Sequence, residues 1–380
     1  REGSSTPPGV FIGRILRRSV LLSLGAFAAM QNTVIAIAAS LTSLAVALGI
    51  AYAAGYPGVG NQLAGSAAVG PVIAYAAGFA VVIQWIVFVP AYIYQTETYY
   101  DLTGSITYVI ITLGTLIYRM AYSNRLEQTS NIRPIVSSVL VVIWAARLGS
   151  FLVRRIHRAG GKDGRFDKIK PSFAAFLAAW TIQGLWVFLT LLSVLILNTT
   201  VEDKELQWSD YLGWCVWLVG FSLEVISDNQ KSQFNELRTG KWVEVGLWKY
   251  SRHPNYFGEI IIWVGQWIVG TSIYTGGQWV SVLSPLFVTL LLTKITGIPM
   301  LEKRADEKWG TDPDYQRYKK VVSVLLPLPR RVISDAYNLH SSGGDTTPAP
   351  VSPTRVDFDE PTPAQNSQAA NSSVTAGRNP

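Results

Sequence analysis

Long apolar runs, separated by short polar stretches, constrain this chain more than any other feature of its sequence. The backbone has no water to bind inside a bilayer, so runs of about 20 apolar residues indicate membrane-spanning helices. Charged residues make up only 15% of the 380 residues, well below the usual share of about a quarter. The sequence therefore predicts an all-α, polytopic transmembrane helical bundle with roughly eight crossings. The predicted spans are residues 19–54, 71–94, 106–122, 135–153, 173–197, 211–226, 260–274 and 279–298.

The two ends of the chain differ from this pattern. Residues 1–18 form a basic N-terminal segment, and the membrane domain is predicted over residues 19–333. From residue 334 to residue 380 the chain is rich in Ser, Thr, Pro, Ala and Gly without an apolar period, which predicts a disordered tail.

The distribution of charge predicts which loops face the cytosol. Residues 147–170 are the most basic stretch and residues 227–254 are basic again, so both are expected on the cytosolic side. Residues 198–210 are net acidic and begin with a glycosylation sequon at Asn198, which suits the opposite side. The loop at 119–133 is mildly basic yet falls on that opposite side, so orientation is clearest for the last four spans. A net charge of +7 arises from such loops, and we expect a lipid bilayer and no nucleic acid as partner.

A dense set of polar residues stands where residues 246–259, GLWKYSRHPNYFGE, enter an apolar helix. Arg252, His253, Asn255, Tyr256 and Glu259 fall within eight positions. The proline at position 254 disfavours helical geometry before it and suits the first helical turn after it, so the helix should begin near Asn255. Ionisable groups at membrane depth are costly and usually line a site, although an interfacial anchor is the simpler alternative.

Two further polar segments fall on the same predicted side. Such a set of cations and carboxylates can hold the phosphates and ribose hydroxyls of a nucleotide, while each residue alone could equally be a solvated loop charge. The three histidines lie far apart in sequence, so no metal site is expected. The candidates in these two segments are Asp228, Lys231 and Arg238, followed by Glu302, Arg304, Tyr315 and Tyr318.

These motifs together resemble a known membrane family. SDNQKSQFN, RHPNYFGE, GIPMLEKRADEKWG and DPDYQRYKK are similar to segments of the family that contains the steroid 5-alpha-reductase C-terminal domain. The stretch YDLTGS at 100–105, with ARLGSFLVRRI and GKDGRFDKIK, resembles its uncharacterised branch of the DUF1295 type. The resemblance covers about residues 100–329 and leaves the first span and the tail uncovered.

The resemblance implies NADPH-dependent reduction of a carbon–carbon double bond in a lipid of the sterol or enoyl type. The cofactor would lie in the part formed by residues 228–320, open to the cytosol. By position in the matching motifs, Asp228 contacts the cofactor, Asn255 and Glu259 lie near the nicotinamide, and Arg252 and Arg304 contact phosphate or ribose. Tyr315 and Tyr318 match aromatic positions that close over the cofactor. The endoplasmic reticulum is the membrane expected for such an activity.

Reduction of an alkene also needs an acid that binds a conjugated carbonyl or protonates the alkene. A tyrosine in a dry pocket suits this role, and the candidates are Tyr100 and Tyr256, with Asp101 or Glu259 orienting the hydroxyl. Tyr100 could equally be an interfacial belt residue, and Asp101 could cap a nearby helix.

Two other functions stay open at the level of sequence. Membrane isoprenylcysteine and phospholipid methyltransferases have a similar RHP-x-Y-x-G element and would bind S-adenosylmethionine in place of NADPH. The direct succession of Gly258 and Glu259, and the Asp228 and Lys231 element, favour the reductase. A non-catalytic membrane scaffold is the third possibility, because a fold alone never shows activity.

Overall fold

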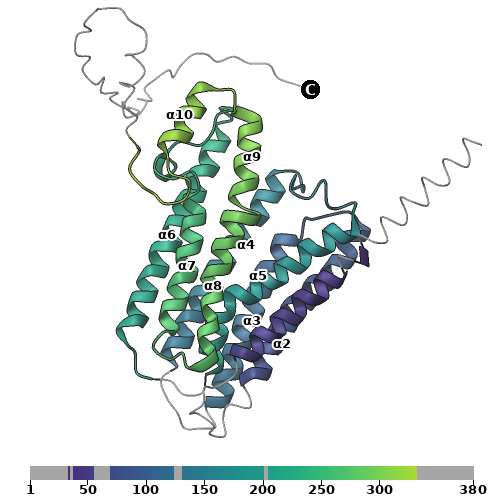
Figure 1. Ribbon diagram of the computed structural model, residues 1–380, viewed down its shortest axis with the longest axis vertical. Coiled ribbons are helices and arrows are strands. Elements are labelled where there is room, and N and C mark those ends of the chain that lie inside the picture. Colours follow the sequence, from purple (N-terminus) through teal and green to yellow (C-terminus); the bar gives the residue numbers. More distant parts are fainter. Residues whose placement is uncertain (1–32, 35–36, 55–68, 124–130, 201–203, 332–380) are drawn as a thin grey trace, which may run out of the picture. The chain divides into compact units, whose positions relative to one another are not determined.

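Helix α5 (Phe173–Thr199) lies at the centre of a helical bundle, where α2 (Val69–Ile93), α3 (Tyr100–Ser123) and α8 (Leu283–Leu290) pack against it (Figure 1). The computed structural model describes residues 33–34, 37–54, 69–123, 131–200 and 204–331. These residues contain helices and no β-strand, which confirms the predicted all-α bundle. The predicted N-terminal segment at 1–18 and the predicted tail at 334–380 lie outside the described residues.

Local sequence explains where several helices begin. α5 starts after Ser172, whose side chain accepts a hydrogen bond from a backbone N–H of the first turn. Pro254 opens α7 at its first position, as predicted, and His253 before it is non-helical with φ −140° and ψ 58°. The other elements are α4 (Ile132–Arg158), α6 (Trp208–Glu236), η2 (Gly246–Lys249), α7 (Pro254–Gly270), η3 (Gly276–Val282), the π-helical η4 (Leu291–Ile295), α9 (Ile298–Trp309) and α10 (Pro313–Val321).

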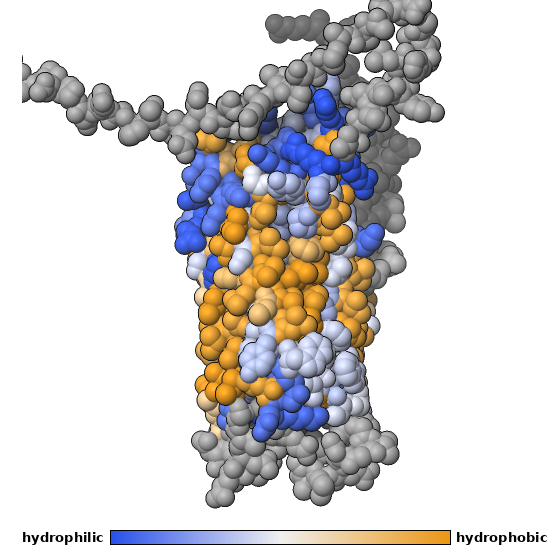
Figure 2. All heavy atoms as spheres, turned by 90° about the vertical axis from the view of Figure 1, so that its left-hand side faces the viewer, coloured by the Kyte–Doolittle hydropathy of each residue, from blue (hydrophilic) through white to orange (hydrophobic). Residues whose placement is uncertain are grey.

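Six helical segments of the described chain are long and apolar enough to cross a membrane. Figure 2 shows one face of the molecule, with apolar side chains across the middle and hydrophilic side chains toward both ends. The protein is therefore an integral, multi-pass membrane protein. α6 and α7, which were predicted as two further crossings, are not among these six segments, and they pack against each other within the same bundle. The six segments are Ile37–Ala54, Pro71–Ile93, Tyr100–Ala121, Ile132–Arg158, Phe173–Thr199 and Gly276–Trp309.

Several helix boundaries differ from the sequence-based prediction, and α3 and α6 are two examples. The polar stretch before residue 106 was expected to be a connection, but α3 already begins at Tyr100. α6 was expected to end near residue 226, but it continues to Glu236. Both extensions carry polar side chains that find partners on other helices, so their polarity does not end the helix.

The end of the bundle opposite α9 and α10 is closed by a buried ion pair. Arg133 of α4 and Asp210 of α6 are both fully buried, with 2.6 Å between Nε and Oδ1. Asn198 is also fully buried, and its Nδ2 donates to Ser138 Oγ at 3.0 Å. The sequon at Asn198 is therefore part of the core.

Candidate functional site

Glycine contacts between α6 and α7 position the polar residues of the candidate site. A Cβ atom on Gly220 of α6 would lie 2.7 Å from the carbonyl oxygen of Gly258 and from the N of Ile262 in α7. The same contact recurs between Gly213, seven residues before Gly220 in α6, and Gly265, seven residues after Gly258 in α7. Because two backbones can approach this closely only without side chains between them, the polar residues beside these glycines are brought together.

Five polar residues from α4, α6 and α7 then form one network, which we call the carboxylate cluster. Arg147 Nη1 lies 2.8 Å from Glu224 Oε1, and Arg147 Nη2 lies 2.8 Å from Asp228 Oδ2. Asn255 Nδ2 donates to Asp228 Oδ1 at 3.2 Å, and Glu259 lies one turn further along α7. The cluster therefore combines one guanidinium with three carboxyl groups inside a membrane bundle.

Burial makes this arrangement energetically demanding. The side chains of Glu224 and Asp228 are only 4% and 7% exposed, and Glu259 is 7% exposed. Trp144 Nε1 donates to Glu224 Oε2 at 3.0 Å. In contrast, Glu259 Oε1 has no hydrogen-bond partner among the described residues. An unpaired buried carboxyl oxygen is costly, and a donor from a bound ligand would relieve that cost.

Tyr256 connects the carboxylate cluster to the loop before α7. Its ring stacks on that of His253, with 5.7 Å between centroids and 10° between planes. Electrostatic interactions reach Tyr256 from Glu259 and also from Arg155 and Arg165, which belong to the end of α4 and the loop after it. Tyr256 is therefore close to charged groups of both signs.

A second network surrounds Glu302 of α9, and we call it the Glu302 cluster. Arg252 Nη1 lies 2.8 Å from Glu302 Oε2, and His253 Nε2 lies 2.9 Å from Glu302 Oε1. Lys319 Nζ lies 3.5 Å from Glu302 Oε2. Burial lowers the pKa of His253 below its ordinary value, although the hydrogen bond to Glu302 acts in the opposite direction. Arg252 Nε is buried without a hydrogen-bond partner among the described residues.

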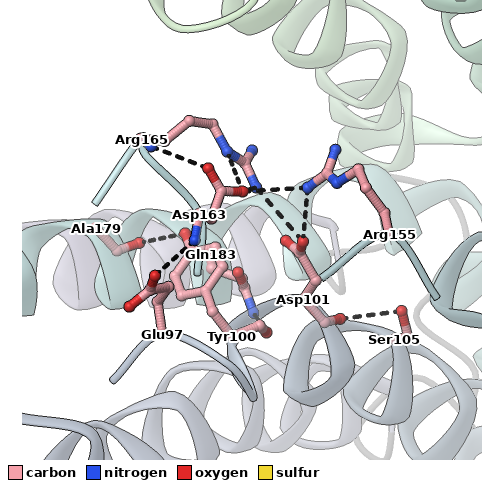
Figure 3. Close-up of polar contacts among 9 residues, drawn as sticks. All are labelled: Glu97, Tyr100, Asp101, Ser105, Arg155, Asp163, Arg165, Ala179 and Gln183. Atoms are coloured by element: carbon pink, nitrogen blue, oxygen red, sulfur yellow. Dashed lines mark hydrogen bonds and ion pairs between the residues drawn. The ribbon is translucent and has the colours of Figure 1, made fainter. Parts of the chain in front are cut away.

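A third network, the Asp101 cluster, joins the start of α3 to the α4–α5 loop (Figure 3). Arg155 Nη2 lies 3.1 Å from Asp101 Oδ2 and 3.2 Å from Asp163 Oδ2. Arg165 Nη2 lies 3.4 Å and 2.7 Å from the same two oxygens. Burial acts to raise the pKa of Asp163, but the hydrogen bond and charge of Arg165, with the charge of Arg155, outweigh it and lower that pKa. Glu97 Oε1 accepts the backbone N–H of Asp163 at 2.7 Å.

Tyr100 lies beside the Asp101 cluster but points into the core (Figure 3). Its hydroxyl donates to the carbonyl oxygen of Ala179 in α5 at 2.9 Å. Its ring packs edge-on against Phe166 and Trp180, with centroids 4.7 Å and 5.0 Å away. The structure thus gives Tyr100 a packing role, whereas Tyr256 is the candidate tyrosine beside the carboxylate cluster.

The remaining predicted cations occupy different surroundings. Lys231 Nζ lies 5.0 Å from the centroid of the Trp248 ring and interacts electrostatically with Asp228. Arg304 Nη2 donates to the carbonyl oxygen of Gly164 at 3.2 Å, which links α9 to the α4–α5 loop. Arg238 is exposed beyond the end of α6, with a φ of 49°. Lys231 is thus the cation of this set that lies nearest the carboxylate cluster.

Tyr315 and Tyr318 of α10 form an aromatic cluster with Trp242. The ring centroids of Tyr315 and Trp242 are 5.2 Å apart. Tyr318 donates to the carbonyl oxygens of Val243 and Trp248 at 3.3 Å and 3.2 Å. Burial raises the pKa of both tyrosines above their ordinary value. These side chains hold α10 against the loop before α7.

Sequence reasoning missed the central residues of the carboxylate cluster. In the sequence, Arg147 and Glu224 stand near the ends of the predicted spans 135–153 and 211–226, and Trp144 precedes Arg147 by three positions. Arg147 and Glu224 are separated by 77 positions, so their pairing has no local signal. Each is a charged residue inside an apolar run, which marks a functional candidate, and Arg147 also stands in the motif ARLGSFLVRRI. Among the described residues, no group of three or more His, Cys, Asp or Glu side chains could hold a metal ion.

Comparison with known families places this arrangement in a wider context. The comparisons with curated proteins and with solved structures gave no match. A family model described as "Protein of unknown function (DUF1295)" matches residues 87–322, which include all three networks and more than half of the chain. The chain therefore belongs to the DUF1295 family.

Proposed function

We propose that the protein is an integral membrane oxidoreductase that uses NADPH to reduce a carbon–carbon double bond in a lipid of the sterol or enoyl type. The observation that carries the proposal is the carboxylate cluster with its unpaired Glu259 Oε1, beside Tyr256 at one end of the bundle. The motif resemblance to the steroid 5-alpha-reductase C-terminal domain supports the same activity. The endoplasmic reticulum is the membrane that we propose for it.

The residues present fit a dinucleotide with an amide at one end. Glu259 Oε1 would accept a hydrogen bond from the carboxamide NH₂ of the nicotinamide, and Asn255 lies one turn before it on α7. Arg252 Nε is a second buried atom without a partner, and as a cationic donor it suits a phosphate or ribose oxygen. Lys231 and Arg304 are further cations for that end of the ligand.

NADPH, when bound, supplies the hydride. The chain itself must supply the proton and keep water away. Tyr256 is the proposed proton donor, because its hydroxyl belongs to a largely buried ring beside Glu259 and Asp228. Glu259 would orient that hydroxyl, and the stacking of His253 on Tyr256 fixes the ring. The buried aromatic residues Trp144, Tyr108 and Trp263 pack edge-to-face or stacked behind the cluster and exclude water.

The charge of the carboxylate cluster favours reduction over methyl transfer. Three carboxyl groups lie around one guanidinium, so any ionised carboxylate beyond the one that balances Arg147 would stabilise positive charge nearby. Positive charge develops on a nicotinamide when hydride leaves, whereas the sulfonium of S-adenosylmethionine loses its positive charge when the methyl group leaves. Because only interactions that strengthen in the transition state accelerate a reaction, this cluster would assist hydride transfer and oppose methyl transfer.

Ligand-induced stabilisation of the purified protein tests the proposal. The full chain in detergent is heated with NADPH, NADH or S-adenosylmethionine, beside Glu259→Leu, which removes the acceptor, and the matched control Glu205→Leu, which is exposed at the opposite end. A ligand present at a hundred times its Kd should stabilise the folded state by about 2.7 kcal/mol. We expect NADPH to stabilise the wild type and the control, and to stabilise Glu259→Leu much less.

Three other results would overturn the proposal. Stabilisation by S-adenosylmethionine alone would indicate methyl transfer, and no stabilisation of the folded wild type by any of the three ligands would indicate a scaffold. Equal stabilisation of Glu259→Leu and the wild type by NADPH would place the cofactor elsewhere. A protein that responds to NADPH would then be screened for NADPH oxidation with enone and sterol lipids.

A further inference from the structure

A cavity outside the three networks opens between the end of α6, the loop before α7 and α10. Its volume is about 370 Å³. Three cationic and two acidic side chains line it, so the formal charge of the lining is +1 (3 − 2). The lining also includes Trp242 and Tyr318. The charged residues are Lys241, Arg317, Arg330, Glu244 and Asp314.

Two of the three cations remain available for a ligand. Arg330 is already paired, with 2.6 Å between its Nη2 and Glu244 Oε1, and Trp242 Nε1 donates to the other Glu244 oxygen at 3.1 Å. The side chains of Lys241 and Arg317 have no hydrogen bond or ion pair among the described residues. The cavity therefore offers one ammonium and one guanidinium to an anion of phosphate type.

The apolar surface beside this cavity indicates the chemistry of the rest of the ligand. The segment after α10 runs along the loop before α7, with the backbone N–H of Leu328 donating to the carbonyl oxygen of Tyr250 at 3.2 Å. Val324, Leu326 and Leu328 are 40%, 48% and 48% exposed, and Tyr250 is 47% exposed. The alternation of exposed side chains places an apolar strip between Val321 and Arg330, which both line the cavity.

The position of the cavity along α6 corresponds to the depth of lipid headgroups. Trp208 and Tyr211 are exposed at the start of α6, as expected of residues at a membrane interface. A helix rises about 1.5 Å per residue, so it crosses a hydrocarbon core about 30 Å thick in about 20 residues. Counted from Tyr211, the core therefore ends near Lys231. Phe234, which lines the cavity, lies about 5 Å beyond that point, within the headgroup layer.

From these observations we infer that the cavity binds the phosphate headgroup of an anionic membrane phospholipid. Lys241 and Arg317 contact the phosphate, and the acyl chains extend along the strip of Val324, Leu326 and Leu328. Lys241 and Arg317 belong to none of the three networks described above, so the inferred phosphate contacts differ from the proposed cofactor contacts at Arg252 and Glu259.

Thermal stabilisation of the full chain in detergent tests the inference. The probes are dioctanoyl phosphatidylglycerol, dioctanoyl phosphatidylcholine and inorganic phosphate. The double variant Lys241→Ala/Arg317→Ala is compared with Lys320→Ala/Arg331→Ala, which removes two exposed cations that do not line the cavity. Since a hydrogen bond to a charged group contributes about 1.5–3 kcal/mol, the first variant should bind phosphatidylglycerol at least about tenfold more weakly. The control should bind it as the wild type does.

A third variant separates a lipid from a free anion. Leu326→Gln/Leu328→Gln changes only exposed side chains, and we expect it to weaken the effect of phosphatidylglycerol. If both cation variants bound phosphatidylglycerol more weakly by the same factor, binding would depend on general surface charge, and the inference would be overturned. Stabilisation by inorganic phosphate as strong as by phosphatidylglycerol, or an equal response to phosphatidylcholine, would overturn it too. The inference would also be overturned if Lys241→Ala/Arg317→Ala were no longer stabilised by NADPH but were still stabilised by phosphatidylglycerol.

Discussion

Replacement of Arg147 by methionine should reveal how strongly the carboxylate cluster depends on its one guanidinium. Methionine keeps much of the length of the side chain but removes both 2.8 Å ion pairs, to Glu224 and to Asp228. These two side chains are 4% and 7% exposed, so both carboxylates lose their cation while they remain buried. Breaking a buried pair costs about 3–5 kcal/mol, and we expect about 3 kcal/mol here because Arg147 itself is 17% exposed.

The assay is unfolding of the purified chain in mixed micelles with increasing SDS, followed by tryptophan fluorescence. Arg154→Met is the matched control, because Arg154 is exposed on the same helix seven residues later. Its loss should change the free energy of unfolding by less than about 0.5 kcal/mol.

A second substitution tests the cause of the loss. In Glu224→Gln the amide oxygen can still accept the hydrogen bond from Trp144, while the charge is removed. If uncompensated charge causes the destabilisation, Arg147→Met/Glu224→Gln should be more stable than Arg147→Met, with a coupling of about 1–3 kcal/mol. The reasoning is refuted if Arg147→Met has the same free energy of unfolding as Arg154→Met. It is also refuted if adding Glu224→Gln to Arg147→Met lowers the free energy of unfolding further.

Three further predictions concern other parts of the structure. Gly220→Ala would force a methyl group to 2.7 Å from the backbone of α7, so it should destabilise the protein by about 1–3 kcal/mol in the same assay, whereas Gly114→Ala, which meets no atom within 4 Å, should not. Asn198 is fully buried, so the protein made in a glycosylating host should show no mobility change at this sequon on treatment with an endoglycosidase. Burial lowers the pKa of His253, so the unfolded chain takes up a proton near pH 6.5 before the folded chain does, and the stabilisation is present above that pH and lost as the pH falls below it. His253→Gln should weaken this acid sensitivity of the unfolding midpoint, and His157→Gln on the exposed surface of α4 should leave it unchanged.

The positions of the apolar helices could be predicted from sequence because hydropathy is a local property. The predicted span 173–197 corresponds to α5 (Phe173–Thr199), and the predicted helix start near Asn255 corresponds to the start of α7 at Pro254. The start of α3 could not be predicted in the same way. Asp101 lies in its first turn, where the helix dipole favours a carboxylate, and its side chain pairs with Arg155 and Arg165, which are more than fifty positions away.

The basic loop on the far side has a similar explanation. Arg133 raised the apparent positive charge of that loop, which made the orientation of the first half ambiguous. In the structure Arg133 is paired with Asp210, 77 positions later, so it contributes no free charge to that side. A rule that counts basic residues along the sequence cannot see a partner that folding supplies.

The candidate site was predictable in its motifs and not in its centre. Asp228, Asn255 and Glu259 were expected to lie together from motif resemblance, and the structure brings them together across the glycine contact of α6 and α7. Arg147 comes from α4 and stands in the motif ARLGSFLVRRI, to which the sequence assigned no role in the site. Tyr100 and Asp101 were expected near the same chemistry, but Tyr100 hydrogen-bonds to a backbone carbonyl and packs among aromatic rings.

The two buried charge networks of this bundle can be compared directly, and the comparison favours a ligand site over a structural support. At the far end, Asp210 accepts from Nε and Nη2 of Arg133, whose Nη1 and Nη2 also reach the carbonyl oxygens of Lys204 and Glu205 at 3.1 Å. One cation there meets one carboxylate, and the hydrogen bonds are complete.

The carboxylate cluster is incomplete by the same standard. It sets one guanidinium against three carboxyl groups and leaves Glu259 Oε1 without a partner among the described residues. A chain that builds a complete buried ion pair at one end has no structural need for an incomplete one at the other, since apolar side chains would serve stability as well or better. The missing donor is what a bound molecule would bring, so the incomplete network is the part of this bundle that is best explained by a ligand.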